Sequence, residues 1–130
     1  MAKKRYDIII PSDYEIKPKE LEAARILATH YQVNVHILSP SKGFMEKTPD
    51  FAINGCNYEL KTPLTSNIRS INNIIQLATK QSENVVIDIR KSKITEKRMN
   101  FVCNERLKSL KKLKRIVLIV NNKKVLEFSK

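Results

Sequence analysis

Cysteine is scarce in this sequence. Only Cys56 and Cys103 occur, they form no CxxC pair, and neither has a histidine beside it. A zinc site or a disulfide framework is therefore not expected. Because disulfides persist mainly in oxidising compartments, a cytoplasmic location is the default expectation for this chain.

Glycine and long apolar segments are scarce as well. The chain has two glycines, Gly43 and Gly55, and no internal repeat or low-complexity linker. Its longest apolar run, IVLIV at residues 116–120, is far below the roughly 18 residues that a membrane span requires. The opening MAKKRYDIIIPSD has only three consecutive apolar residues, too few for the core of a signal peptide. The sequence therefore indicates neither a membrane span nor a secretion signal.

Acidic and aromatic residues are few. Thirteen Asp and Glu oppose 25 Lys and Arg, which gives a net charge of +12. Such an excess favours a polyanionic partner, because each phosphate contact releases condensed counterions. A membrane surface would satisfy the charge equally well, but the sequence has no basic helix with a bulky aromatic face. Aromatic residues make up 6% of the chain and mostly occupy apolar periodic positions, so base-stacking platforms are not evident.

The length of 130 residues and the hydrophobic content of 42% suit a single domain, residues 1–130. Periodicity predicts helices at residues 17–30, 68–78 and 95–113. It predicts strands at residues 6–10, 33–37, 84–89, 115–120 and 125–128, a hairpin around Asn54–Gly55 and a loop at 39–48. The resulting order, β-α-β-β-β-α-β-α-β-β, indicates an α/β domain in which a mixed β-sheet is flanked by helices.

The central hairpin carries three charged residues at defined positions. Asn-Gly favours a two-residue turn, and this register would place Asp50 directly opposite Glu59, with Cβ atoms about 4.5–5.5 Å apart. Side chains alternate along a strand, so Asp50, Glu59 and Lys61 share one face. The opposite face is apolar and carries Phe51, Ile53, Cys56, Tyr58 and Leu60. A register slip would expose this apolar face, so the pairing is well specified.

Two carboxylates facing each other repel, and a divalent cation between them would reverse the sign of that interaction. Mg²⁺ commonly uses one or two carboxylates together with water and substrate phosphate. Lys61 lies two residues after Glu59 on the same face and could orient a water molecule or offset charge on a phosphate. The alternative is a surface hairpin whose polar face is scattered and has no chemical role.

The motif formed by these residues resembles that of a known nuclease group. Pro49-Asp50 followed by Glu59-Leu60-Lys61 resembles the PD-(D/E)XK signature of the restriction-endonuclease-like superfamily. The longer stretch PDFAINGCNYELKTP…KQSENVVIDIR resembles the C-terminal tRNA-nuclease toxin domains of contact-dependent growth inhibition (CdiA-type) proteins, over about residues 20–120. The resemblance implies a restriction-endonuclease-like core and a Mg²⁺- or Mn²⁺-dependent endonuclease that cuts tRNA rather than DNA. It also implies a possible acidic immunity protein as partner.

The resemblance also implies residue roles. Asp50 and Glu59 would bind the metal, and Lys61 would assist the attacking water. Such nucleases often add a glutamate from the first helix, for which Glu20 and Glu22 compete. Glu20 is preferred because it lies at the edge of the helix's core-facing stripe. Either glutamate could instead simply complement the helix dipole in its first turns.

Further residues are candidates for contacts with nucleic acid. They are Ser66, Asn67, Lys80, Gln81, Arg90, Lys111, Lys112 and Arg115. Each has a structural alternative: Ser66 as the N-cap of the second helix, Arg90 as the ion-pair partner of Asp88, and the others as solvated helix ends or faces.

Two further functions stay open at this point. One is a DNA endonuclease of the same superfamily, and the other is a non-catalytic nucleic-acid-binding or phage-associated module with the same fold. Because the sequence begins with its own Met, no delivery module is expected in this chain. It is expected to be a free-standing enzyme, a mobile-element product or an excised toxin domain.

Overall fold

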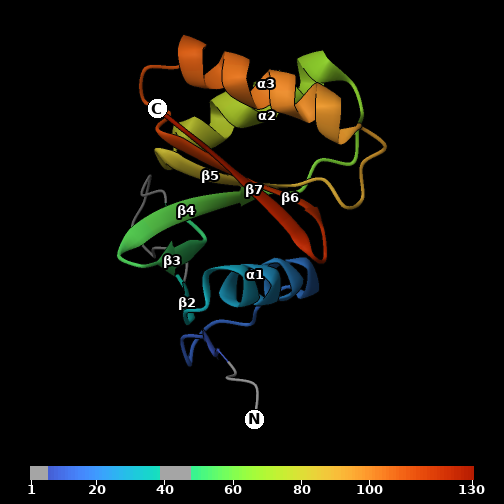
Figure 1. The fold of residues 1–130 in the computed structure, drawn as a ribbon. Helices are drawn as coiled ribbons and strands as arrows, with labels where there is room; N and C mark the ends of the chain where they lie inside the picture. Colours follow the sequence, from blue (N-terminus) through green and yellow to red (C-terminus); the bar gives the residue numbers. More distant parts are fainter. Residues whose placement is uncertain (1–5, 39–47) are drawn as a thin grey trace.

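A seven-stranded mixed β-sheet forms the centre of the molecule, and its strands lie side by side in chain order (Figure 1). The structure is a computed structural model and describes residues 6–38 and 48–130. The elements are β1 (Ile8–Ile9), α1 (Pro18–Tyr31), β2 (Val35–Ile37), β3 (Phe51–Ile53), β4 (Cys56–Lys61), α2 (Ile68–Thr79), β5 (Asn84–Asp88), α3 (Glu96–Ser109), β6 (Arg115–Asn121) and β7 (Lys124–Ser129). Strands β4, β5 and β6 are mutually parallel, as are β1 and β2, and the other neighbouring pairs are antiparallel.

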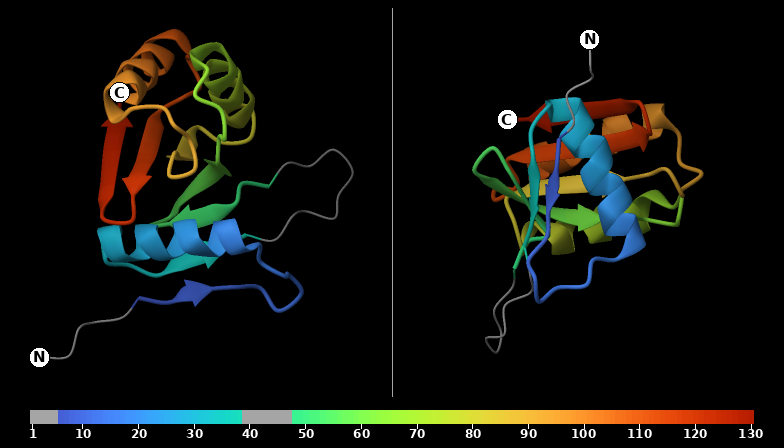
Figure 2. Two further views of the ribbon diagram at one scale, coloured as in Figure 1. Left: turned by 90° about the vertical axis from the view of Figure 1, so that its right-hand side faces the viewer. Right: turned by 90° about the horizontal axis from the view of Figure 1, so that it is seen from below.

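The helices cover both faces of the sheet. Helix α1 lies on one face, and α2 and α3 lie together on the other (Figures 1 and 2). Under α1, residues such as Ala24 and Leu27 pack against Phe51 and Leu60. On the opposite face, a second core joins α2 and α3 to strands β5 and β6. The predicted mixed sheet flanked by helices is therefore confirmed, as is the order of its elements.

Helix starts follow the local sequence. Helix α1 begins at Pro18, whose missing N–H has no helical partner to lose at this position. At the start of α2, the side chain of Asn67 accepts a hydrogen bond of 3.1 Å from the backbone N–H of Ser70. The prediction that Ser66 is this N-cap is wrong, because Asn67 has the extended backbone from which an amide oxygen reaches the first turn.

The hairpin register is as predicted over three residue pairs. Phe51 pairs with Tyr58, Ala52 with Asn57, and Ile53 with Cys56. The turn is closed by Asn54 and Gly55, which both have positive φ (51° and 79°), as a two-residue hairpin turn of this type requires.

The pairing stops one residue short of the prediction. The backbone N–H of Asp50 donates to the carbonyl of Tyr58 (2.9 Å), and the ladder extends no further than Phe51 and Tyr58. The predicted cross-strand pair of Asp50 and Glu59 is therefore not formed. The chain leaves the ladder at Asp50 because the side chain of this residue turns to the backbone N–H of Leu60 (2.8 Å).

Other bounds differ in detail from the predictions. Strand β1 spans only Ile8–Ile9, α3 ends at Ser109, and β7 extends to Ser129. The predicted loop at 39–48 lies, except for Thr48, outside the described residues. Within residues 6–38 and 48–130, no helix has the length and apolar character needed to cross a membrane.

Candidate active site

A cavity of about 380 Å³ opens beside the carboxyl end of β4. It is lined by Lys17, Lys19, Glu20, Asp50, Glu59, Leu60, Lys61, Thr62, Pro63 and Ile74. The four residues predicted to be catalytic, Glu20, Asp50, Glu59 and Lys61, are among them. Glu20 lies in the first turn of α1, and Asp50 directly precedes β3. Glu59 and Lys61 both lie on β4. The hairpin and the start of the first helix therefore meet at one site.

Glu59 is the most buried polar group of the cavity, with 4% of its surface exposed. Its Oε2 atom lies 3.4 Å from the ammonium of Lys61. Its Oε1 atom is buried and accepts no hydrogen bond from the described residues. Burial, and after it the neighbouring carboxyl group of Asp50, raises the pKa of Glu59 to about 7, although Lys61 opposes the shift. The ionised carboxylate is thus under-compensated, and a proton or a cation would stabilise it.

Asp50 is held by the backbone of the neighbouring strand. Its Oδ2 atom accepts a hydrogen bond of 2.8 Å from the N–H of Leu60, the residue between Glu59 and Lys61. This contact fixes the Asp50 carboxylate beside the two charged side chains of β4. The site is therefore assembled even though the two carboxylates are not a cross-strand pair.

Glu20 is buried, with 7% of its surface exposed. The hydroxyl group of Tyr14 donates a hydrogen bond of 2.7 Å to its Oε1 atom. Burial, this hydrogen bond, and the charges of Glu20 and Asp50 together raise the pKa of Tyr14 to about 12. Tyr14 therefore stays protonated at neutral pH and acts as a hydrogen-bond donor to Glu20.

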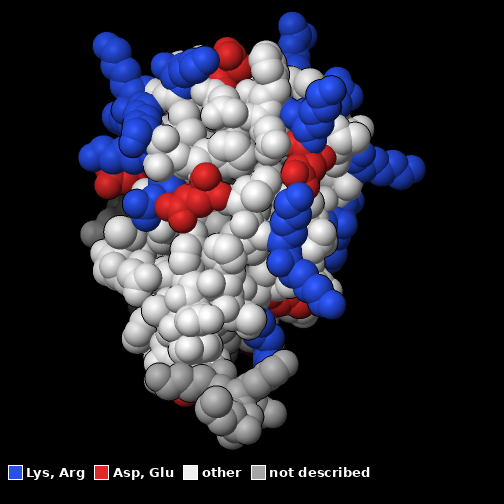
Figure 3. All heavy atoms as spheres, viewed as in Figure 1, with Lys and Arg blue, Asp and Glu red and all other residues white. Residues whose placement is uncertain are grey.

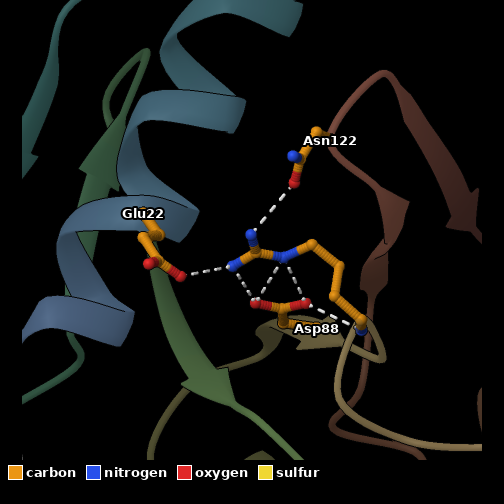
Figure 4. Close-up of polar contacts among 4 residues, drawn as sticks. Glu22, Asp88 and Asn122 are labelled. Atoms are coloured by element: carbon orange, nitrogen blue, oxygen red, sulfur yellow. Dashed lines mark hydrogen bonds and ion pairs between the residues drawn. The ribbon is translucent and has the colours of Figure 1, made fainter.

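Glu22, the alternative to Glu20, belongs to a different cluster. Its Oε2 atom lies 3.4 Å from Arg90, which also contacts Asp88 and Asn122 (Figure 4). The guanidinium of Arg90 donates to both oxygens of the Asp88 carboxylate, at 2.8 to 3.2 Å. Asp88 is 1% exposed. Neither Glu22 nor Arg90 lines the cavity; instead they connect α1, β5 and the turn between β6 and β7.

The cavity fits a divalent cation only in part. Across the described ranges, no group of three His, Cys, Asp or Glu side chains is arranged to hold a metal ion. A site built on Asp50 and Glu59 is nevertheless consistent with Mg²⁺, which commonly takes one or two carboxylates and completes its shell with water. The unpartnered Oε1 of Glu59 is an oxygen available to such an ion.

Two basic residues of the cavity are absent from the sequence predictions. Lys17 and Lys19 flank Pro18 at the start of α1 and line the cavity with Lys61. Tyr14, which lies in the segment before α1, was missed as well. No sequence pattern marks these residues, because their position depends on how the start of α1 and the segment before it lie beside β4.

The residues predicted to contact nucleic acid do not all gather at this cavity. Ser66 and Asn67 are exposed and precede α2, and the neighbouring Thr62 and Pro63 line the cavity in their place. Arg115 donates a hydrogen bond of 2.9 Å to the Tyr58 hydroxyl and forms an ion pair with Glu127 (3.1 Å).

The remaining predicted contacts lie near the amino ends of β5 and β6, away from the cavity at the carboxyl end of β4. Lys80, Gln81, Lys111 and Lys112 line two neighbouring clefts where α2 and α3 end. The structure thus divides the predicted residues between a carboxylate-rich cavity and a basic region.

Comparison with known proteins identifies relatives of the chain. No curated protein matches it. Its fold is similar to that in a solved structure, the CdiA-CT/CdiI toxin and immunity complex from Burkholderia pseudomallei, with a TM-score of 0.72 and 19% sequence identity. The match covers 93% of this chain and 98% of the other. The model of the family described as "Contact-dependent growth inhibition CdiA C-terminal domain" matches residues 47–125, more than half of the sequence. The chain therefore belongs to the CdiA C-terminal domain family.

Proposed function

We propose that this chain is a divalent-metal-dependent endonuclease of the PD-(D/E)XK type, which hydrolyses phosphodiester bonds in tRNA in preference to DNA. The observation that carries the proposal is the convergence of Asp50, Glu59 and Lys61 on one cavity, where a buried carboxylate oxygen has no partner among the described residues. Either a proton or a bound cation would stabilise that oxygen. The net charge of +12 favours a polyanionic substrate.

In this proposal the carboxylates of Asp50 and Glu59 hold Mg²⁺ or Mn²⁺, with Glu20 as a third acidic group beside them. The bound cation would neutralise phosphate charge and make water a better nucleophile at neutral pH. Lys61, whose ammonium lies 3.4 Å from Glu59, would orient the attacking water or offset negative charge on the phosphate oxygens. Lys17 and Lys19 at the start of α1 would attract the phosphate group to the cavity.

The proposal extends to the biological role and the fold type. Membership of the CdiA C-terminal domain family, together with the likeness to a toxin–immunity complex, supports a toxin. The basic charge of the chain suits an acidic immunity protein, because complementary charges steer and align partners.

We assign the unit of α1, the β3–β4 hairpin, α2 and β5 to a restriction-endonuclease-like core, because it places the motif Pro49-Asp50…Glu59-Leu60-Lys61 at the end of a sheet strand.

The test is a cleavage assay with purified protein, on tRNA and on duplex DNA, with Mg²⁺, Mn²⁺ or a chelator. We expect tRNA to be cleaved with either metal and left intact with the chelator. Asp50→Ala should lower the rate by at least about 100-fold, since it removes a metal ligand. Asp7→Ala, which removes an exposed aspartate, serves as the matched control and should retain activity.

Two results would overturn the proposal. One is the absence of cleavage of both polymers with either metal, at protein concentrations comparable to the substrate. The other is undiminished cleavage by Asp50→Ala. Cleavage of DNA but not tRNA would retain the nuclease and change the substrate.

A further inference from the structure

Two clefts adjoin one another where α2 and α3 end, near the amino ends of β5 and β6. One, of about 260 Å³, is lined by Gln76, Thr79, Lys80, Ser109, Leu110, Lys111 and Lys112. The other, of about 400 Å³, is lined by Thr79, Lys80, Gln81, Ser82, Glu83, Lys112 and Lys114. Because they share Thr79, Lys80 and Lys112, they form one continuous surface, called here the basic cleft. On the face shown in Figure 3, Lys and Arg side chains gather over the end of the molecule that holds α2 and α3.

The positive charge of the basic cleft exceeds what its surroundings neutralise. Glu83 is the one acidic side chain among the described lining residues, and it pairs with Lys114 at 3.4 Å. The carboxyl end of each helix carries about −0.5 charge. The ammonium of Lys130 already occupies the end of α3, where it donates to the carbonyls of Leu110 (2.7 Å) and Lys111 (3.2 Å). Lys80, Lys111 and Lys112 therefore leave a surplus of about two to three positive charges.

The basic cleft is fixed to the strand that carries the catalytic candidates. Its Ser82 hydroxyl donates to the carbonyl of Asn57 at the start of β4 (2.8 Å), and the Asn84 side chain donates to the same oxygen (3.2 Å). Lys61 in the cavity lies four residues further along β4. At about 3.3 Å per residue, the cleft edge and the cavity are about 13 Å apart along the strand. In a double-helical segment, where one strand carries a phosphate about every 3.4 Å along the helix axis, this distance corresponds to about four nucleotides.

We propose that the basic cleft is a second binding site for the substrate, which holds backbone phosphates about four nucleotides away from the bond at the cavity. The inference rests on the proposed function and deepens it. The enzyme would bind a strand at two places, so a substrate that ends before the cleft would lose affinity without losing access to Asp50 and Glu59. Lysines serve this purpose because phosphate contacts position a strand without reading its bases.

The test is fluorescence anisotropy with labelled RNAs of 3 and 12 nucleotides, in chelator so that no cleavage occurs, from 50 to 200 mM NaCl. The cleft variant replaces Lys80, Lys111 and Lys112 with Ala. The control variant replaces three exposed basic residues elsewhere, Arg25, Lys97 and Lys123, and so lowers the net charge equally. Circular dichroism melting curves establish that both variants fold.

We expect the cleft variant to bind the 12-nucleotide RNA at least 10-fold more weakly at 0.1 M salt. The slope of log K against log salt should fall by about 2, since each single-strand phosphate contact contributes about 0.7. The 3-nucleotide RNA should bind as before, and replacement of the three lysines with Arg should restore affinity. The control variant should change binding of the longer RNA by less than 3-fold.

Equal losses in the cleft and control variants would overturn the proposal, because net charge alone would then explain binding. Equal losses on the short and long RNA would overturn it too. Binding of the long RNA through these lysines, by a protein that cuts neither tRNA nor DNA, would refute the nuclease and still support the cleft.

Discussion

Glu59 is the single residue on which the site depends most. It lies on β4 between Tyr58 and Leu60, whose side chains enter the core under α1, and itself faces the cavity. A structural role would require both of its oxygens to be hydrogen-bonded, yet Oε1 has no partner among the described residues. A buried carboxylate left in this state destabilises the fold, so its presence indicates a ligand or a proton in the working protein.

The raised pKa of Glu59 predicts a specific dependence of stability on pH. The folded protein holds the Glu59 proton up to about pH 7, whereas the unfolded chain releases it near pH 4.5. Protonation therefore favours the fold, and the free energy of unfolding should fall between these pH values by about 2–3 kcal/mol in metal-free buffer. Glu59→Gln should remove this part of the dependence and be more stable than the wild type at pH 8.

Urea unfolding from pH 4 to 8, with chelator present, measures this dependence. Addition of Mn²⁺ at pH 8 should stabilise the wild type and leave Glu59→Gln almost unchanged. An identical pH dependence in both proteins would show that Glu59 is not the group responsible.

Tyr14 is predicted to position Glu20 rather than to react. Tyr14→Phe removes the 2.7 Å hydrogen bond to Glu20 and should weaken Mn²⁺ binding by about 10-fold, as is typical when a partner of a metal ligand is lost. The cost in stability should stay near 1 kcal/mol. Isothermal titration calorimetry with Mn²⁺ measures the effect, and Tyr6→Phe, at a half-buried tyrosine that packs against the same core, is the control. Unchanged Mn²⁺ affinity would show that the hydroxyl group of Tyr14 does not position Glu20 for metal binding.

Among the secondary-structure elements, the cluster of Arg90, Asp88, Glu22 and Asn122 has a structural role. It joins α1, the end of β5 and the β6–β7 turn through one guanidinium group (Figure 4). The bidentate contact with Asp88 uses the geometry in which arginine binds carboxylates most strongly. Arg90, a predicted nucleic-acid contact, is thus largely occupied within the protein.

Asp88→Ala should therefore destabilise the protein by about 3–5 kcal/mol, because it leaves the half-buried Arg90 charge without its main partner. Glu96→Ala is the matched control, since it breaks an ion pair with Lys124 in which both side chains are partly exposed, and should cost less than about 1 kcal/mol. Urea unfolding of both variants measures the difference. Similar small losses would mean that the cluster contributes little to the fold.

Local sequence patterns predicted the elements well, because each depends on neighbouring residues. The Asn54–Gly55 turn set the hairpin register, and that register brought Glu59 and Lys61 to one face. The position of Asp50 was less predictable, since a side-chain bond to the Leu60 backbone ends the ladder there. Lys19 could not be predicted, because it reaches the cavity only through the packing of α1. The contact of Tyr14 with Glu20 likewise depends on how the segment before α1 folds back on that helix. The separation of Lys80 from the cavity likewise follows from the direction of α2.

At the scale of the whole molecule, charge is the dominant property. The excess of 12 positive charges repels itself in the compact state, and salt screens this repulsion. The free energy of unfolding should therefore increase by about 1 kcal/mol between 0.02 and 0.5 M NaCl, while affinity for nucleic acid falls over the same range. Urea unfolding and anisotropy on the same samples measure both trends. A fold that weakens with salt would show that local ion pairs outweigh the net charge.

The arrangement of the sheet has a consequence for how the chain acquires its structure. Each strand pairs with the strands next to it in the sequence, so no early segment must wait for a distant one to complete its ladder. This order limits the length of the loop that each new pairing must close, and so limits the entropy that each closure costs. A sheet with this strand order can be assembled strand by strand as the chain emerges during its synthesis.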